Sequence, residues 1–248
     1  MDSVDKIEVE RFAGNAAEWW DPRGQFGPLH RITPCRITYI REQVLRHFAR
    51  EAGAAKPFSG LSFVDIGCGG GLVAEPLARL GGAVTGVDPG AENIAVARSH
   101  AEAQGLPIGY RAGTSHDLVA EGLQFDGVIA FEVIEHVPDP QAFLASCAAL
   151  VRPGGLVLTS TLNRTAKSFA LAIVGAEYVL RWLPRGTHRW DRFVTPAEME
   201  DGLRKAGLEP SGHRGMTLSP LTGTWRISND TDVNYFTAAA KPELSRCG

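Results

Sequence analysis

A run of glycines between an apolar strand pattern and an apolar helix pattern constrains this chain most. Residues 63–66 are apolar except for Asp65, residues 67–71 read Gly-Cys-Gly-Gly-Gly, and residues 72–80 carry apolar side chains at helical spacing. This pattern predicts strand, loop and helix in that order. Because glycine lacks a side chain, such a loop can adopt left-handed φ angles and let a ligand lie against its backbone. We therefore expect a ligand-binding site on this loop.

A second strand pattern covers residues 83–87 and ends in Asp88. An acid about twenty residues after a glycine loop is placed to accept hydrogen bonds from both hydroxyls of a ribose. Glycine loops of this kind bind dinucleotides, flavins or S-adenosylmethionine, so the loop and Asp88 together predict a nucleoside-containing ligand.

The rest of the chain alternates between strand and helix patterns, which favours right-handed crossovers and a parallel sheet. We predict one domain over residues 1–248 with an α/β, Rossmann-like fold: a seven-stranded, mostly parallel sheet, helices on both faces and an antiparallel last strand. Residues 219–232 are predicted to be a polar connection. The predicted strands cover residues 61–66, 83–87, 108–112, 125–131, 156–161, 208–214 and 233–241, and the predicted helices 35–52, 71–80, 92–104, 140–151 and 196–206.

Three segments resemble the motifs of class I S-adenosylmethionine-dependent methyltransferases, in the order that this class has them. They are the D-x-G-x-G-G-G loop from Asp65 to Gly71, the strand and turn at 125–137, and the turn into a strand at 150–158. The resemblance implies S-adenosylmethionine as the cofactor.

Further segments resemble the ubiquinone-biosynthesis O-methyltransferases, and this likeness extends from Phe12 to Lys241. It implies methylation of ring hydroxyls on polyprenylated phenol and catechol intermediates, at both O-methylation steps of the pathway. Two alternatives stay open: a methyltransferase of a soluble phenol, and a non-catalytic scaffold of a quinone-synthesis complex. The segments are residues 19–21, 28–32, 36–39, 132–140, 160–164, 174–178, 184–188 and 232–235.

The family resemblance also implies cofactor-binding residues. Arg36 would pair with the methionine carboxylate, Gly67 would give the backbone approach, Asp88 would hold the ribose, and Phe131 would lie beside the sulfonium or the adenosine. Arg36 could alternatively be a surface residue of a helix. The chain has Thr114-Ser115-His116 where the family often has an acid, so the adenine contact is left open.

Glu132, Glu135 and His136 follow the strand pattern at 125–131 and are the candidates for the chemistry on the phenol. On a helical turn, Glu132 would project on the same side as both other residues. Two carboxylates and an imidazole could hold a divalent ion such as Mg²⁺ or Zn²⁺, and the resemblance supports this ligand set. Alternatively, no metal binds and His136 serves as the general base or as a helix cap.

Two segments outside the predicted sheet are candidates for a functional role. Residues 1–53 combine an aromatic, turn-rich stretch with a helix, and the aromatic stretch is either a lid over the cofactor or a strap packed on the core. Residues 163–193 form an insertion with an apolar middle and basic ends. It suits an interfacial helix that contacts a membrane surface, or a helix that covers the substrate pocket or a dimer surface.

Composition favours a cytoplasmic protein. The net charge of −3, from 25 Lys and Arg against 28 Asp and Glu, gives no electrostatic reason to expect nucleic-acid binding. No apolar stretch reaches the length of about 20 residues that spans a bilayer, and we expect no signal peptide. The expected partners are the polyprenylated phenol, the inner membrane surface through residues 163–193, and other proteins of ubiquinone biosynthesis.

Overall fold

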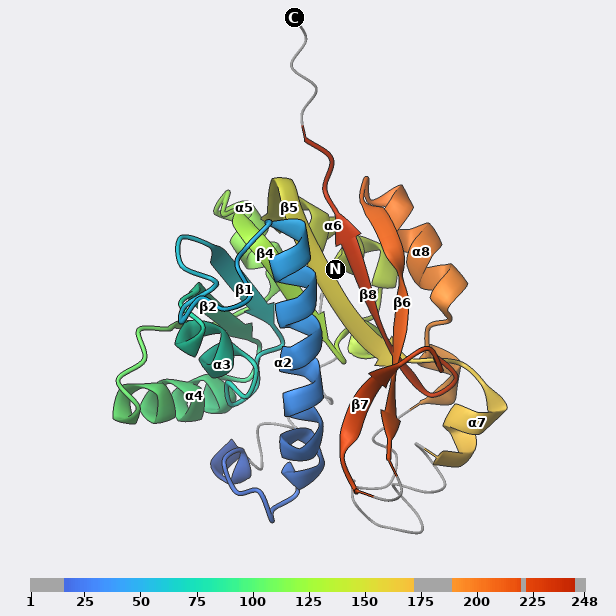
Figure 1. Cartoon of the computed structure of the whole chain (residues 1–248), viewed down its shortest axis with the longest axis horizontal. Coiled ribbons are helices and arrows are strands. Elements are labelled where there is room, and N and C mark those ends of the chain that lie inside the picture. The colour runs from blue at the N-terminus through green and yellow to red at the C-terminus, as the bar shows by residue number, and fades with distance from the viewer. Residues whose placement is uncertain (1–15, 172–188, 220–221, 244–248) are drawn as a thin grey trace, which may run out of the picture.

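The computed structural model describes residues 16–171, 189–219 and 222–243. Its strands form one sheet with the order β3-β2-β1-β4-β5-β8-β6-β7 (Figure 1). β1 to β5 are parallel, whereas β8 is antiparallel to β5 and to β6, and β7 is antiparallel to β6. The strands are β1 (Ser62–Ile66), β2 (Ala83–Asp88), β3 (Gly109–Ala112), β4 (Phe125–Phe131), β5 (Val151–Leu162), β6 (Glu209–Leu218), β7 (Trp225–Ser228) and β8 (Asn234–Ala240).

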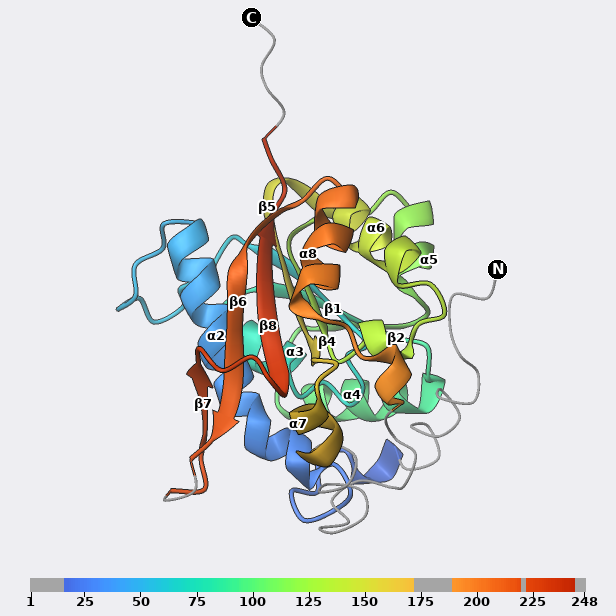
Figure 2. The ribbon, with the colours of Figure 1, turned by 90° about the vertical axis from the view of Figure 1, so that its right-hand side faces the viewer.

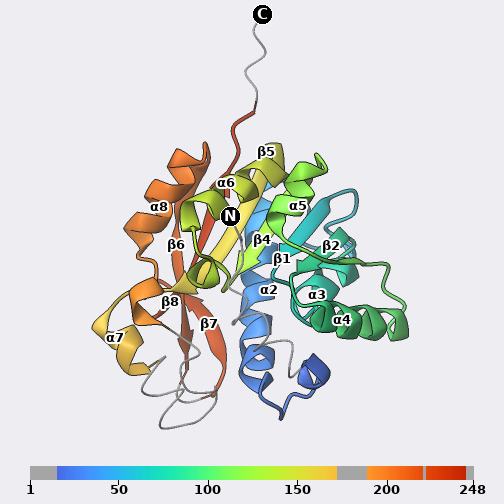
Figure 3. The same ribbon diagram turned by 180° about the vertical axis from the view of Figure 1, so that it is seen from behind.

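Helices cover both faces of this sheet. α2, α3 and α4 pack on one face, and α5, α6 and α8 pack on the other, as the opposite views in Figures 1 and 3 show. The described helices are α2 (Gly27–His47), α3 (Ala74–Arg79), α4 (Ala91–Ala103), α5 (Ser115–Ala120), α6 (Pro140–Leu150), α7 (Ala166–Ser168) and α8 (Pro196–Lys205), with the 3-10 turns η1 (Ala16–Glu18), η2 (Ile134–His136) and η4 (Trp190–Arg192).

The two cores follow from the alternation of side chains along each strand. Phe63 and Ile129 point into the core under α2, α3 and α4, whereas their neighbours Val64 and Val128 point into the core under α5, α6 and α8. Because successive strand residues face opposite sides, strands covered on both faces are buried along their length and are mostly apolar. All seven residues of β4 are accordingly buried.

The helix before the first strand differs from the prediction at both ends. It begins at Gly27, eight residues before the predicted start, with Pro28 in its first turn, where a missing N–H is tolerated, and Pro34 inside it. It ends at His47, not near Gly53, and Ala49 takes the left-handed φ of 48° beyond it. Prolines within the aromatic stretch concealed the first turns of this helix.

The described residues form a sheet of eight strands in place of the predicted seven. The additional strand, β7, lies within the predicted polar connection at 219–232 and pairs with the end of β6. Only Trp225 and Ile227 supply its apolar side, and both are half-buried against the core under α2. Four residues with two apolar positions are too short a pattern to distinguish an edge strand from a loop. The predicted antiparallel last strand and the helices on both faces are confirmed.

Strand order places the candidate residues together. β1 has β2 on one side and β4 on the other, so the chain winds away from this pair in both directions. Ligands of open α/β sheets bind beyond the carboxyl ends of the strands at such a switch point. Gly67 follows β1, Asp88 ends β2, and Phe131 ends β4. β8 lies between β5 and β6, and Figure 2 shows it beside β6. The first residue of β8 pairs with the last residue of β5.

Candidate active site

Asp88 organises the glycine loop from the end of β2. Its Oδ2 accepts a hydrogen bond from the Gly69 backbone N–H at 3.0 Å. Its Oδ1 accepts from the Gly90 N–H at 2.8 Å and from the Asn93 amide at 3.0 Å. Burial raises the pKa of Asp88, and these three hydrogen bonds oppose the shift. The carboxylate therefore fixes the loop that follows β1 against the start of α4.

Gly67 and Gly69 need to be glycines for different reasons. Gly67 has a φ of 69°, and a Cβ atom at this position would lie 2.7 Å from Cγ2 of Val133, so the loops after β1 and β4 touch. Gly69 has a φ of 51°, and its Cβ atom would overlap the ring of Trp19. A side chain at either position would combine backbone strain with a steric conflict.

Two tryptophans from the aromatic stretch lie on the glycine loop. The Trp19 indole packs against Gly69 and Gly70, and its Nε1 donates to Oδ1 of Asn93 at 2.8 Å. Trp20 donates from Nε1 to the Gly70 carbonyl at 2.9 Å. Asn93 thus joins Trp19 to Asp88, and the aromatic stretch is tied directly to the predicted cofactor residues.

His100 packs against Trp20 and is itself held by a buried carboxylate. The Trp20 ring stacks on His100 with centroids 3.5 Å apart, and Nδ1 of His100 lies 2.6 Å from Oε1 of Glu75. Glu75 is buried on α3 and His100 lies on α4. Trp20 is therefore anchored to α4 through His100, which the carboxylate of Glu75 on α3 holds in turn.

Arg36 is buried, so its alternative assignment as a surface residue is wrong. Its side chain is 6% exposed, and its Nη2 lies 3.6 Å from Oε1 of Glu132. Neither Nε nor Nη2 has a hydrogen-bond partner among the described residues. The guanidinium lies 5.9 Å from the centre of the Phe131 ring. A buried cation with unpaired donors fits an anionic group of a ligand, because leaving such donors unpaired is costly.

Besides Glu132, Asp65 is a second carboxylate on which the charge of Arg36 acts, and it is buried. Burial raises the pKa of Asp65 to about 7, although the charge of Arg36 lowers it. Its Oδ2 is buried without a hydrogen-bond partner in the described part of the chain. Asp65 was singled out in the sequence only as the first residue of the loop motif, and the structure adds it to the candidate site.

Glu132 has a left-handed backbone, with a φ of 55°. Such a conformation is strained for a residue other than glycine and is concentrated at functional sites. Its Oε1 accepts hydrogen bonds from Ser160 Oγ at 2.7 Å and from the Asn234 amide at 2.9 Å. Residues from β5 and β8 therefore hold the Glu132 carboxylate beside Arg36.

Glu135 and His136 lie on η2, and their surroundings differ. Glu135 is buried, and its Oε2 accepts from Thr161 Oγ1 at 3.0 Å. Burial first, and then the charge of Glu132, raise the pKa of Glu135 to about 7, while His136 lowers it. His136 is half-buried. The turn thus combines a buried acid with a more accessible imidazole.

The predicted metal ligands do not fit a metal centre as the structure arranges them. Within residues 16–171, 189–219 and 222–243, no three His, Cys, Asp or Glu side chains are gathered so that they could hold an ion. One oxygen of Glu132 already accepts two hydrogen bonds, and Glu135 points to Thr161.

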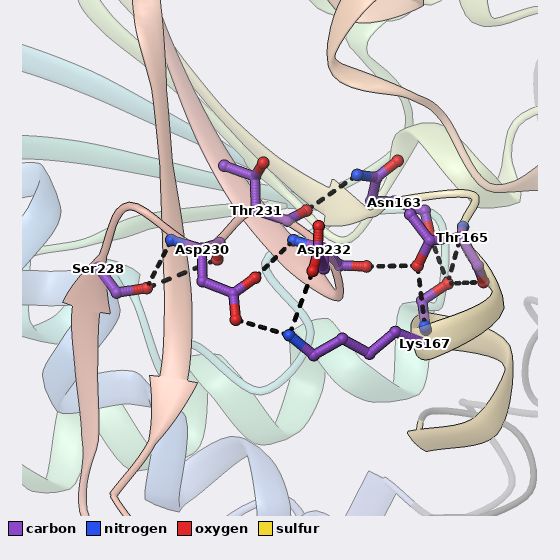
Figure 4. A network of polar contacts seen from close by, with 8 residues as sticks. Asn163, Thr165, Lys167, Ser228, Asp230, Thr231 and Asp232 are labelled. Carbon is purple, nitrogen blue, oxygen red and sulfur yellow. Dashed lines mark hydrogen bonds and ion pairs between the residues drawn. The ribbon is translucent and has the colours of Figure 1, made fainter.

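A polar network fixes the start of the insertion to the loop before β8 (Figure 4). Lys167 of α7 pairs with Asp230 at 2.6 Å and with Asp232 at 3.3 Å. Thr165 Oγ1 donates to the Asp232 carbonyl at 2.6 Å, and the Asn163 amide donates to the Thr231 carbonyl at 2.9 Å. The core of the insertion, at 172–188, lies outside the described residues.

Apolar side chains are exposed beside this network. Phe169 and Leu171 are 46% and 55% exposed, and Trp190 is 40% exposed on η4. The rings of Phe169 and Trp190 meet edge to face at 6.4 Å, and Trp190 donates from Nε1 to the Thr165 carbonyl. Both described ends of the insertion therefore meet in one exposed apolar group. None of the described helices is long and apolar enough to cross a membrane.

The sequence missed several residues of this site. Trp19 and Trp20 were expected only as part of a lid or strap, and Asn93, Glu75 and Asn234 were not expected as site residues. Their contacts join positions 25 to 102 residues apart, so no local spacing indicates them. The sequence also contained a signal for α5, a helix that we did not predict. Thr114 and Asp117 form the capping box that starts this helix.

The strand order, the glycine loop after β1 and the acid at the end of β2 define a class I S-adenosylmethionine-dependent methyltransferase. The methyltransferase domain family matches residues 36–211. The chain belongs to the ubiquinone biosynthesis O-methyltransferases. It is 53% identical to the protein of that name from Cereibacter sphaeroides, over 97% of this chain and 98% of the relative. It is 54% identical to that from Azorhizobium caulinodans, over 94% of this chain and 92% of the relative.

Solved structures support the fold. Magnesium protoporphyrin IX methyltransferase from Synechocystis PCC 6803 with bound SAH matches with a TM-score of 0.67, at 18% identity, over 96% of this chain and all of that one. A possible histamine N-methyltransferase from Thermotoga maritima matches with a TM-score of 0.59, at 20% identity, over 95% and 98%.

Proposed function

We propose that this protein transfers a methyl group from S-adenosylmethionine to ring hydroxyls of polyprenylated phenol and catechol intermediates in ubiquinone biosynthesis, at both O-methylation steps. The observation that carries this proposal is the 53% identity to a ubiquinone biosynthesis O-methyltransferase over almost the whole of both chains. The arrangement at the carboxyl ends of β1, β2 and β4 supports it, because the residues predicted to bind the cofactor and to act as acid or base lie together there.

Two buried residues of opposite charge, Arg36 and Asp65, match the two ends of an amino acid. Arg36 would bind the methionine carboxylate through Nε and Nη2, and Asp65 would accept from the ammonium group with Oδ2, because none of these three atoms has a hydrogen-bond partner among the described residues. Asp88, at the end of β2, would hold the ribose, with Gly67 allowing backbone approach and Phe131 lying near the sulfonium or adenosine. When bound, S-adenosylmethionine supplies an electrophilic methyl group.

The chain's remaining task is to align the phenol and take its proton. Phenolic oxygen becomes a strong nucleophile once deprotonated, so a base must lie within hydrogen-bond reach. His136 would act as this base, with the buried Glu135 beside it stabilising the imidazolium that forms. Glu132 is held by Ser160 and Asn234 and would orient the ring. Exclusion of water strengthens each of these interactions.

Trp19 and Trp20 would serve as the lid. Their contacts with the Gly69–Gly70 backbone, and their anchors on Asn93 and His100, support a strap that closes the cofactor side of the site. Such a segment excludes water and commits the bound cofactor to reaction.

A direct assay tests the proposed activity. Purified protein is incubated with S-adenosylmethionine and a prenylated catechol in lipid vesicles, and products are identified by mass spectrometry. We expect one added methyl group on a ring oxygen, and more efficient turnover than with the same catechol lacking its tail. Methylation of the tail-less catechol alone would favour the soluble-phenol alternative, and binding of cofactor without any product would favour the scaffold.

The insertion would bring the protein to the cytoplasmic surface of the inner membrane. There it would meet its hydrophobic polyprenylated substrate and other proteins of ubiquinone biosynthesis. The exposed apolar side chains of Phe169, Leu171 and Trp190 support interfacial binding.

Replacing Phe169, Leu171 and Trp190 together by Ser tests the membrane contact. Each buried apolar side chain contributes about 1.5–3 kcal/mol, so we expect vesicle binding to fall at least about 100-fold. Flotation with anionic vesicles measures it, and thermal melting checks the fold. The control is Leu218→Ser, which changes the remaining large exposed apolar side chain of the described residues. An equal loss in this control would contradict a specific role of the insertion.

A further inference from the structure

Asn234 lies where β8 meets the candidate site. It is the first residue of β8 and is paired in the sheet with Leu162, the last residue of β5. Its side chain is almost fully buried, with 6% of the residue exposed. Its Nδ2 donates to Oε1 of Glu132 at 2.9 Å. The amide therefore faces the loop after β4, where the proposed methyl transfer takes place.

The carboxylate of Glu132 fixes which way this amide points. An ionised carboxylate only accepts hydrogen bonds, so the NH₂ group of Asn234 must face it and the carbonyl oxygen must face away. Oδ1 of Asn234 is buried and has no hydrogen-bond partner among the described residues. A buried acceptor without a donor costs about 1–3 kcal/mol. A ligand that donates a hydrogen bond to Oδ1 of Asn234 would remove this cost.

An amide oxygen selects a particular kind of ligand group. It accepts a hydrogen bond but does not take up a proton at neutral pH, so it cannot serve as the base for the hydroxyl that is methylated. It is suited to a hydroxyl that keeps its proton. Because the Asn234 amide is bonded to Glu132, its oxygen lies close to the residue that is proposed to orient the ring.

We propose that Oδ1 of Asn234 accepts a hydrogen bond from the ring hydroxyl adjacent to the one that is methylated, and that Asn234 thereby selects catechol-type acceptors. This inference rests on the proposed function and names the acceptor group that the same site reads. Sites that hydrogen-bond a substrate hydroxyl reject analogues without it strongly, since the protein group is then left unpaired.

Asn234→Leu tests the proposal by removing the acceptor at similar volume. Selectivity is measured as the Ki of a prenylated ring with a single hydroxyl divided by the KM of the matching catechol. We expect this ratio to fall at least about tenfold, chiefly through a higher KM for the catechol. Affinity for S-adenosylhomocysteine, measured by calorimetry, should stay within about twofold and shows that the variant is folded. Asn234→Ala repeats the test should the Leu side chain prevent folding.

Ser160→Ala is the matched control, because Ser160 is the other residue that donates to Oε1 of Glu132. It loosens Glu132 without removing the Asn234 oxygen, so we expect both acceptors to bind more weakly by the same factor. An unchanged ratio in the Asn234 variants would overturn the proposal, as would an equal change of ratio in Ser160→Ala. Loss of S-adenosylhomocysteine affinity with an unchanged ratio would assign the oxygen to the cofactor's ammonium group and would also overturn it. A wild-type protein that methylates no catechol would instead refute the proposed function.

Discussion

Asp88→Ala is expected to abolish measurable binding of S-adenosylhomocysteine and to lower the melting temperature. The alanine removes the proposed acceptor of the ribose hydroxyls. It also leaves the N–H groups of Gly69 and Gly90 and the amide of Asn93 without their acceptor. Hydrogen bonds to charged groups are worth about 1.5–3 kcal/mol each, so an affinity loss of at least about 100-fold is expected. Titration calorimetry and thermal melting measure the two effects.

Asp88→Asn separates the two roles of this side chain. The amide keeps one acceptor oxygen of similar position and loses the charge and the second acceptor. We expect its melting temperature to lie closer to that of the wild type than to that of Asp88→Ala. Its affinity for the cofactor should still fall by more than about tenfold. Wild-type affinity in Asp88→Ala would remove Asp88 from the cofactor site. From the sequence alone we would expect an intact fold in this variant, whereas the three internal hydrogen bonds predict a destabilised one.

The sequence predicted the parts of the site that depend on neighbours along the chain. Gly67 and Asp88 were found because an apolar strand pattern stops at each of them, and the order of strands then brings their loops together. Glu132, Glu135 and His136 were found as a group for the same reason. Local spacing did not predict how these three side chains are arranged. Glu132 takes a left-handed φ and pairs with Arg36. Among the described residues the three side chains do not form a set that could hold an ion.

Contacts between distant segments account for what the sequence did not predict. Trp19 reaches Asn93 across 74 positions, and Asn234 reaches Glu132 across 102. Each contact depends on how two elements pack in three dimensions, and neither leaves a periodic pattern. β7 was missed for a related reason, because an edge strand of four residues is stabilised by its partner β6 and not by its own pattern.

Arg36→Met is expected to weaken cofactor binding at least about 100-fold and to make stability strongly dependent on pH. The guanidinium is the cation that faces Glu132, Asp65 and Glu135, and its charge lowers the pKa of Asp65. Removing one partner of a buried ion pair costs about 3–5 kcal/mol, because the other charge is left uncompensated. Arg36→Lys keeps a charge but loses the planar fork, so intermediate affinity for S-adenosylhomocysteine is expected.

The pH dependence follows from the direction of the pKa shifts. Burial raises the pKa of Asp65 from 3.8, and that of Glu135 from 4.5, to about 7 in both cases. A carboxyl group with a raised pKa in the folded state contributes stability below its unfolded pKa, and this contribution is lost as pH rises through the folded value. The ligand-free wild-type protein should therefore become less stable between about pH 4 and pH 7. In Arg36→Met the pKa of Asp65 rises further, so stability should keep falling above pH 7, and the variant should be close to wild type only in acid. Urea unfolding at pH 5 and pH 8 measures this difference. Equal destabilisation at both values would show that Arg36 supports the fold by packing alone and does not compensate the buried carboxylates.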